Sequence, residues 1–170
     1  LQSPHEVNAA AFLPPAQARH SEVGLVAAVG RSITALRIQG PGPSVSARLE
    51  ELYRLFSDAR DIEELHAHNS KVLWREIGAV ARLLPNPNKA IWRISLPPVS
   101  SPTVAASLKV LEDAEMYLDW GGSLIWLSVQ DIKGAGAEQV RACLTKCGGH
   151  ATLMRAADKT KTQVPVFHPQ

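Results

Sequence analysis

Apolar and polar residues alternate along this chain with two periods, one of two residues and one close to four. Segments with the two-residue period predict strands, because successive side chains of a strand point to opposite faces of a sheet. Segments with the longer period predict amphipathic helices. The predicted strands lie near 6–13, 32–39, 90–96, 115–120, 123–129 and 150–155. The predicted helices lie at 44–57, 70–84, 101–111 and about 137–147.

Local signals mark the ends of several of these helices. Ser44 is a suitable N-cap for a helix whose apolar stripe has the spacing i, i+4, i+7 and i+11. Ser101 followed by Pro102 predicts a second helix start, because proline lacks the amide proton that would be unpaired there. Gly148 stands where a left-handed residue ends a helix.

From residue 90 onward the predicted order is strand, helix, strand, strand, helix, strand. This order predicts an α+β fold of the ferredoxin-like type, an antiparallel sheet with helices packed on one face. We expect the two strands predicted before residue 90, which are followed by helices, to extend the same sheet. We therefore expect a single domain over residues 1–170, with 156–170 as an irregular tail.

Composition and charge exclude several classes of protein. Hydrophobic residues make up 45% of the chain and charged residues 20%, which is ordinary for a globular domain. The net charge of +2 gives no broad electrostatic footprint for nucleic acid. The longest apolar runs, at 9–13 and 25–29, are far too short to span a bilayer, and no signal peptide is visible. We expect a cytoplasmic protein without a nucleic-acid partner.

Cysteine and histidine offer two places where a metal could bind. Cys143 and Cys147 are four residues apart on a predicted helix, so both thiols reach one side of it. They also lie on the apolar side of that helix, and no second ligand pair is nearby as a zinc site requires. His66 and His68 are two residues apart in a polar connection. We expect no metal site at either place.

No motif of a self-sufficient enzyme is present. The segment GPGP at 40–43 lacks the lysine and hydroxyl residue of a P-loop, and its prolines remove amides that would face a phosphate. Neither a G-x-S-x-G nor an H-E-x-x-H motif occurs. Chemistry motifs alone therefore do not predict an enzyme.

The segment EMYLDWGGSLIWL, residues 115–127, has two interpretations. Gly121 and Gly122 suit a two-residue hairpin loop, because a primed turn needs positive φ angles at both central residues. The resulting register has two reasonable cross-strand pairs, Leu118 with Ile125 and Tyr117 with Trp126. Alternatively, the two glycines let the backbone approach something flat, with Trp120 beside it.

Three segments in this order resemble one known family. They are WRISLP at 92–97, DWGGSLIWL at 119–127 and GGHATLMR at 148–155. In order and approximate spacing they are similar to the C-terminal region of the FAD-binding subunit of bacterial glycolate oxidase, a flavoprotein family of the vanillyl-alcohol oxidase type. The resemblance covers residues 90–155 and extends to the earlier part only in general pattern.

The resemblance implies an architecture and a cofactor. In this family an N-terminal domain binds FAD, and a C-terminal cap domain of ferredoxin-like fold covers the isoalloxazine ring. The chain is similar to the cap alone and begins at Leu1 without a methionine, so we expect it to be a piece of a longer subunit. FAD is then expected in the full-length protein and not in this piece, which we expect to be inactive alone.

The resemblance also implies site residues. Trp120, Gly121 and Gly122 would lie on the cap surface that faces the flavin, where absent side chains permit close approach. Arg93 would bind the carboxylate of a 2-hydroxy acid such as glycolate, because its fork of donors fits a carboxylate. His150 would accept the hydroxyl proton, because imidazole titrates near neutral pH.

Simpler roles for Arg93 and His150 stay open: an ion pair of Arg93 with Asp119 between neighbouring strands, and a structural or surface position for His150. The family implies a second flavin subunit and an iron–sulfur subunit as partners, and a complex that could attach peripherally to the inner membrane. The sequence lacks the histidine-rich metal motif of the catalytic flavin subunit, so this subunit would pass electrons or support assembly. The alternative function is a free-standing ferredoxin-like binding or assembly module without redox activity.

Overall fold

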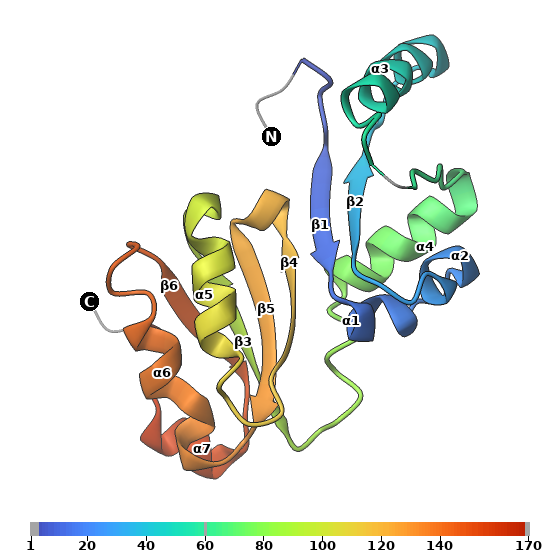
Figure 1. Ribbon diagram of the computed structural model, residues 1–170. Coiled ribbons are helices and arrows are strands. Elements are labelled where there is room, and N and C mark those ends of the chain that lie inside the picture. The colour runs from blue at the N-terminus through green and yellow to red at the C-terminus, as the bar shows by residue number, and fades with distance from the viewer. Residues whose placement is uncertain (1–3, 60, 169–170) are drawn as a thin grey trace.

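The computed structural model describes residues 4–59 and 61–168, which form an α+β fold around one antiparallel sheet (Figure 1). Six strands form the sheet in the order β2-β1-β4-β5-β3-β6. The strands are β1 (Ala9–Leu13), β2 (Ile33–Arg37), β3 (Lys89–Ser95), β4 (Glu115–Asp119), β5 (Leu124–Gln130) and β6 (His150–Arg155). The α-helices are α1 (Pro15–Arg19), α2 (Gly24–Ala28), α3 (Gly42–Leu55), α4 (Ala67–Gly78), α5 (Ser101–Leu108), α6 (Ala137–Ala142) and α7 (Asp158–Gln163). Short 3-10 helices are η1 (Pro98–Ser100), η2 (Trp120–Gly122) and η3 (Lys133–Gly136).

The predicted ferredoxin-like unit is confirmed. It consists of β3, α5, β4, β5, α6 and β6, and its four strands lie in the order β4-β5-β3-β6, all antiparallel. The predicted hairpin register is also confirmed, since Leu118 lies opposite Ile125 and Tyr117 opposite Trp126. The glycine pair predicted this register, because a two-residue primed turn determines which residues of the two strands lie opposite each other.

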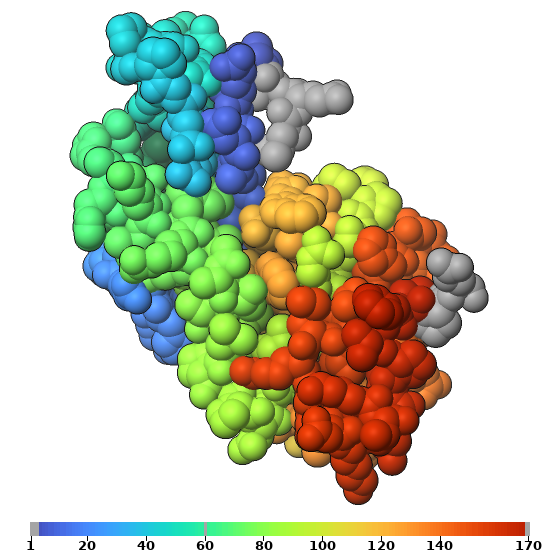
Figure 2. Space-filling model, turned by 180° about the vertical axis from the view of Figure 1, so that it is seen from behind, coloured from blue at the N-terminus to red at the C-terminus, as the bar shows by residue number. Residues whose placement is uncertain are grey.

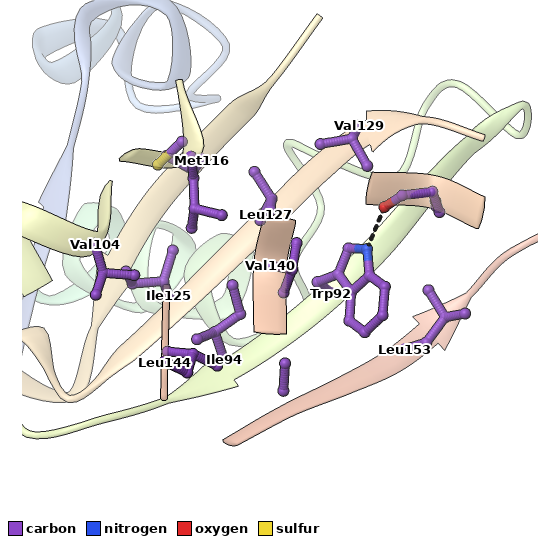
Figure 3. Packing of buried hydrophobic residues seen from close by; sticks show 14 of the residues in the cluster. Trp92, Ile94, Val104, Met116, Ile125, Leu127, Val129, Val140, Leu144 and Leu153 are labelled. Atoms are coloured by element: carbon purple, nitrogen blue, oxygen red, sulfur yellow. Dashed lines mark hydrogen bonds between the residues drawn. The ribbon is translucent and has the colours of Figure 1, made fainter. Parts of the chain in front are cut away.

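One face of the ferredoxin-like unit packs against α5 and α6 through the larger of two hydrophobic clusters (Figure 3). Trp92, at the centre of β3, is fully buried there, and its indole nitrogen donates a hydrogen bond of 2.9 Å to the carbonyl oxygen of Ala135. This bond ties the sheet to η3, whose Ala135 has the unusual φ angle of 52°. A buried indole requires such a partner, so the contact both fills the core and satisfies its one donor.

The strands β1 and β2 extend this sheet at the β4 edge, as expected. The pairing of β1 with β4 is confined to Phe12 and Leu118. A second cluster covers the opposite face at this end of the sheet and includes Leu13 of β1, Ile77 of α4 and Tyr117 of β4. Figure 1 shows α5, α6 and α7 grouped around β3, β5 and β6, whereas α1, α2 and α4 lie around β1 and β2. Helices thus cover opposite faces at the two ends of the sheet.

Several predicted boundaries are wrong by a few residues. The helix α3 begins at Gly42 with Pro41 as its N-cap residue, so Ser44 is not the cap. Proline at the N-terminus of a helix costs no hydrogen bond, which allows the earlier start. The helix α4 ends at Gly78, because Val80 takes a φ angle of 56°. The helix α6 ends at Ala142, and turns continue the segment to residue 147.

Three helices were not predicted. The helices α1 and α2 have five residues each, too short to show a helical apolar period. The segment 156–170, expected to be irregular, contains α7. Its N-terminus is held by the carboxylate of Asp131, which accepts a hydrogen bond from the hydroxyl of Thr160 at 2.6 Å and another from the amide of Ala157. A tertiary contact therefore holds the start of α7, and no local sequence pattern predicts this helix.

Candidate functional site

Near its C-terminal end, β3 is only partly covered on the face that points away from the large core. Trp92 and Ile94 point into the large core, so Ile91, Arg93 and Ser95 lie on the opposite face. The cluster beneath α4 buries Ile91, whereas Arg93 and Ser95 are only half-buried. We call this part of the sheet the open face; it is formed by Arg93, Ser95, Trp126, His150 and Thr152.

Arg93 is the central side chain of the open face. It lies between Trp126 of β5 and Thr152 of β6, and its guanidinium carbon is 5.2 Å from the centroid of the Trp120 ring. This distance is within the range of a cation–π interaction. Within residues 4–59 and 61–168, the Arg93 guanidinium has no acidic partner and donates no hydrogen bond to protein. Its donors therefore remain available for an anion.

The expected alternative, an ion pair between Arg93 and Asp119, is wrong. The strand β5 separates β3 from β4, so the two residues do not lie on neighbouring strands. The Asp119 carboxylate instead accepts a hydrogen bond of 2.7 Å from the backbone amide of Trp120. Burial raises the pKa of Asp119, and the bond from Trp120 opposes that rise.

The hairpin interpretation of the two glycines is confirmed. Gly121 has φ 63° and ψ 28°, Gly122 has φ 90°, and the Ser123 amide donates to the Trp120 carbonyl oxygen at 3.3 Å, as in a type I′ turn. The Ser101 hydroxyl holds the carbonyl oxygen of Gly122. These φ angles account for both glycines without a contact to a flat molecule. Gly121 is exposed, so that contact stays a proposal.

Trp120 itself has a φ angle of 51°, which is uncommon for a residue with a side chain. Both of its backbone groups are held: the amide by Asp119 and the carbonyl oxygen by the Ser123 hydroxyl at 2.8 Å. Trp120 is 56% exposed, and its indole lies against the Arg93 guanidinium. The turn therefore fixes an exposed aromatic ring beside an unpaired cation.

His150 lies on the same face as Arg93. It begins β6 opposite Ser95, and the next residue on that face, Thr152, lies directly opposite Arg93. His150 is exposed. The structure thus brings together Arg93 of β3, His150 of β6 and Trp120 of η2, and adds Thr152, which was not predicted. The alternation of HATLMR already placed Thr152 on the face of His150, and this pattern could have identified it.

An open cleft of about 470 Å³ lies on the same side of the sheet, between β1, α4 and η2. Its lining residues are Asn8, Ala9, Arg37, Trp74, Ile77, Gly78, Asp119, Trp120 and Ser123. The view from behind the sheet shows the orange residues of η2 beside the blue residues of β1, with the green residues of α4 close by (Figure 2). Arg37 and Trp74 come from distant parts of the chain, so sequence analysis did not connect them with Trp120.

A buried charge network lies outside the open face and has a structural role. The carboxylate of Glu76 in α4 pairs with Arg82, and the two side chains are 5% and 1% exposed. Glu76 also accepts bonds from the Ser21 hydroxyl at 2.9 Å and from the Glu22 amide at 2.6 Å. Burial lowers the pKa of Arg82, and the nearby Glu76 opposes that effect. The network fixes the loop before α2 against α4.

The residues considered for metal binding lie in two different environments. Cys143 and Cys147 pack against the large core, and burial raises the pKa of the Cys143 thiol, which favours its neutral form. His66 and His68 are exposed. Within the described residues, no group of three or more histidine, cysteine, aspartate or glutamate side chains is arranged to hold a metal ion.

Comparison with protein-family models, with curated proteins and with solved structures finds no match for this chain. The fold alone defines the class of protein, which is a ferredoxin-like α+β domain extended by two strands at one edge of the sheet. Among the helices of the described chain, none combines the length and the apolar character that a membrane span requires.

Proposed function

We propose that this chain is the cap domain of an FAD-dependent 2-hydroxy-acid oxidase subunit of the glycolate oxidase type. The observation that carries the proposal is the half-buried Arg93, which is stacked on Trp120 and has no acidic partner among the described residues. A guanidinium whose donors are not used by the described residues can bind a carboxylate through two parallel hydrogen bonds. The carboxylate of a 2-hydroxy acid is such an anion.

The open face suits a cap rather than a self-contained cofactor site. It is the uncovered end of a sheet whose other face is packed on α5 and α6, so its side chains stand on a rigid support. Trp120 and Gly121 are exposed at its edge. These residues would cover a planar ring from one side only, and the rest of FAD would be held by another domain.

Each residue of the open face has a distinct role in the proposal. Arg93 would hold the substrate carboxylate through two parallel hydrogen bonds, and Thr152 beside it could add a hydroxyl donor. His150 would accept the proton of the substrate hydroxyl. Trp120 would exclude water from one side. A bound flavin supplies the acceptor for the hydride, which no side chain of the chain can replace.

The partners of the proposal are an FAD-binding domain of the same subunit, a second flavin subunit and an iron–sulfur subunit. A complex of this kind would be cytoplasmic or attached to the inner membrane through its other subunits. In that complex this subunit would pass electrons or oxidise the substrate itself. The kinetic effect of changing Arg93 distinguishes these two roles.

The test uses the Arg93→Gln variant in the complete subunit assembled with its partners. Loss of a charge-assisted contact costs about 1.5–3 kcal/mol, so the KM for glycolate should rise about 10- to 100-fold. Arg19→Gln, at an exposed arginine of α1, is the matched control and should leave KM unchanged. An unchanged KM in Arg93→Gln would remove the carboxylate assignment. A complete subunit without flavin would favour a binding or assembly module instead.

A further inference from the structure

The cleft between β1, α4 and η2 is large enough for a small molecule. It exists because β1 and β4 pair only where Phe12 meets Leu118, and the turn η2 lies against β1 without continuing the pairing. The resulting space of about 470 Å³ is within the range of ligand sites, which extends from about 300 to 1,000 Å³. The residues that line the cleft differ in charge and polarity.

Part of the cleft lining is electronegative. Asp119 lines it although its side chain is nearly buried, with 8% exposure for the residue. The last turn of α4 contributes Trp74, Ile77 and Gly78, so the C-terminus of a 12-residue helix faces the same space. The C-terminus of a helix carries partial negative charge and favours cations. A carboxylate and a helix end together define a cation-attracting wall.

Two indoles line the cleft next to this wall. Trp74 is half-buried, and Trp120 is mostly exposed. Indole faces attract cations, and alkylated ammonium groups are bound between such rings in many proteins. Arg93 lies against Trp120 but does not line the cleft, so its guanidinium does not occupy this space.

The cleft lining also carries a positive charge. Arg37 of β2 is half-buried and lines the cleft, and within the described residues it forms no ion pair. Asp119 lines the same cleft but lies beyond the 4.0 Å limit of an ion pair with Arg37. Opposite charges that share a cleft without meeting are complementary to a molecule that carries both charges at separate ends.

We propose that this cleft binds a small betaine, a quaternary ammonium carboxylate. Its alkylated head lies between Trp74 and Trp120 near Asp119, and its carboxylate pairs with Arg37. The proposal shares Trp120 with the flavin proposal, but Arg37 and Trp74 have no role there, so variants at these two residues test betaine binding alone.

Binding is measured on this 170-residue chain by calorimetry with glycine betaine as the probe. Tetramethylammonium and acetate each carry one end of the probe and should bind at least about tenfold more weakly, since each loses one charged contact. In the amide spectrum, the indole N–H signals of Trp74 and Trp120 should shift during the titration, whereas that of the buried Trp92 should not. Equal affinity for acetate and betaine, or unmoved Trp74 and Trp120 signals, would overturn the proposal.

Two variants test which residues bind the ammonium group and the carboxylate of the betaine. Trp74→Leu and Arg37→Gln should each weaken betaine binding about tenfold, and Arg19→Gln should not. Circular dichroism checks that each variant is folded, and Trp74→Phe, which keeps a ring, should retain most of the affinity. Wild-type affinity in both Trp74→Leu and Arg37→Gln would place the betaine elsewhere and contradict the assignment. Arg93 does not line the cleft, and Arg37 and Trp74 have no role in the flavin proposal, so the effect of Arg93→Gln on KM tests that proposal separately.

Discussion

The Tyr117→Phe variant should be less stable than the wild type at neutral pH and more stable at alkaline pH. Tyr117 is fully buried in the cluster beneath α4, and its hydroxyl donates a hydrogen bond of 2.6 Å to the carbonyl oxygen of Ile77. That carbonyl oxygen also accepts the Val80 amide at 3.1 Å, so it keeps one partner when the hydroxyl is removed. The loss at pH 7 should therefore be that of one ordinary hydrogen bond, about 1 kcal/mol.

At alkaline pH, the difference in stability between Tyr117→Phe and the wild type has the opposite sign. Burial, together with the nearby Asp119, raises the pKa of Tyr117 far above its ordinary value of 10.0, whereas Arg82 opposes the rise. Above pH 10 the unfolded wild type loses the phenol proton and the folded wild type keeps it. The stabilisation linked to this proton is complete below the ordinary pKa and decreases as the pH rises toward the folded pKa. At pH 11.5 the wild type should have lost roughly 2 kcal/mol, so the variant becomes the more stable by about 1 kcal/mol.

Urea denaturation followed by circular dichroism at pH 7 and at pH 11.5 measures both differences. Tyr53 is the other tyrosine and is 39% exposed, which makes Tyr53→Phe the matched control without inversion. In Tyr53→Phe the single remaining phenol should ionise only when the protein unfolds. A Tyr117→Phe variant that stays less stable at pH 11.5, or a phenol that ionises near pH 10 in the folded Tyr53→Phe protein, would refute the reasoning.

Two further variants test the buried polar contacts by urea denaturation. Glu76→Ala leaves the Arg82 guanidinium buried without its counter-charge and should cost about 3–5 kcal/mol, whereas a loss below 1 kcal/mol would mean that water reaches this arginine. Trp92→Phe removes the hydrogen bond to the carbonyl oxygen of Ala135 and part of the core volume, and should cost about 2–4 kcal/mol. A neutral Trp92→Phe variant would show that η3 is held by other contacts.

The strands β3 and β6 were predictable because apolar and polar residues alternate along part of each. In β3, the alternation of Trp92, Ile94 and Leu96 with Arg93 and Ser95 determines which face enters the core. The hairpin of β4 and β5 was predictable down to its register, because the glycine pair admits few turn types.

The contact at the centre of the proposed site was not predictable from alternation. Strand periodicity places Trp120 on the face opposite to Asp119, which is the face covered by α5 and α6. The φ angle of 51° at Trp120 instead turns the indole across β5 toward Arg93. This conformation depends on the bond from the Trp120 amide to Asp119, a local contact that strand periodicity does not encode.

The cleft was not predictable for a different reason. Arg37 comes from an edge strand and Trp74 from a helix, and only the divergence of β1 from β4 places both beside η2. Each residue alone fits its own element, Arg37 at the polar end of a strand and Trp74 on a partly buried helix face. Their association is a property of the tertiary packing.

The visible absorption spectrum of the protein made from its complete reading frame tests the central claim most directly. If Arg93 and Trp120 belong to a cap, the purified protein should be yellow, with the absorption bands of a flavin bound in one-to-one ratio. A colourless protein that also fails to take up added FAD would contradict the cap assignment and leave the chain as a ferredoxin-like binding module.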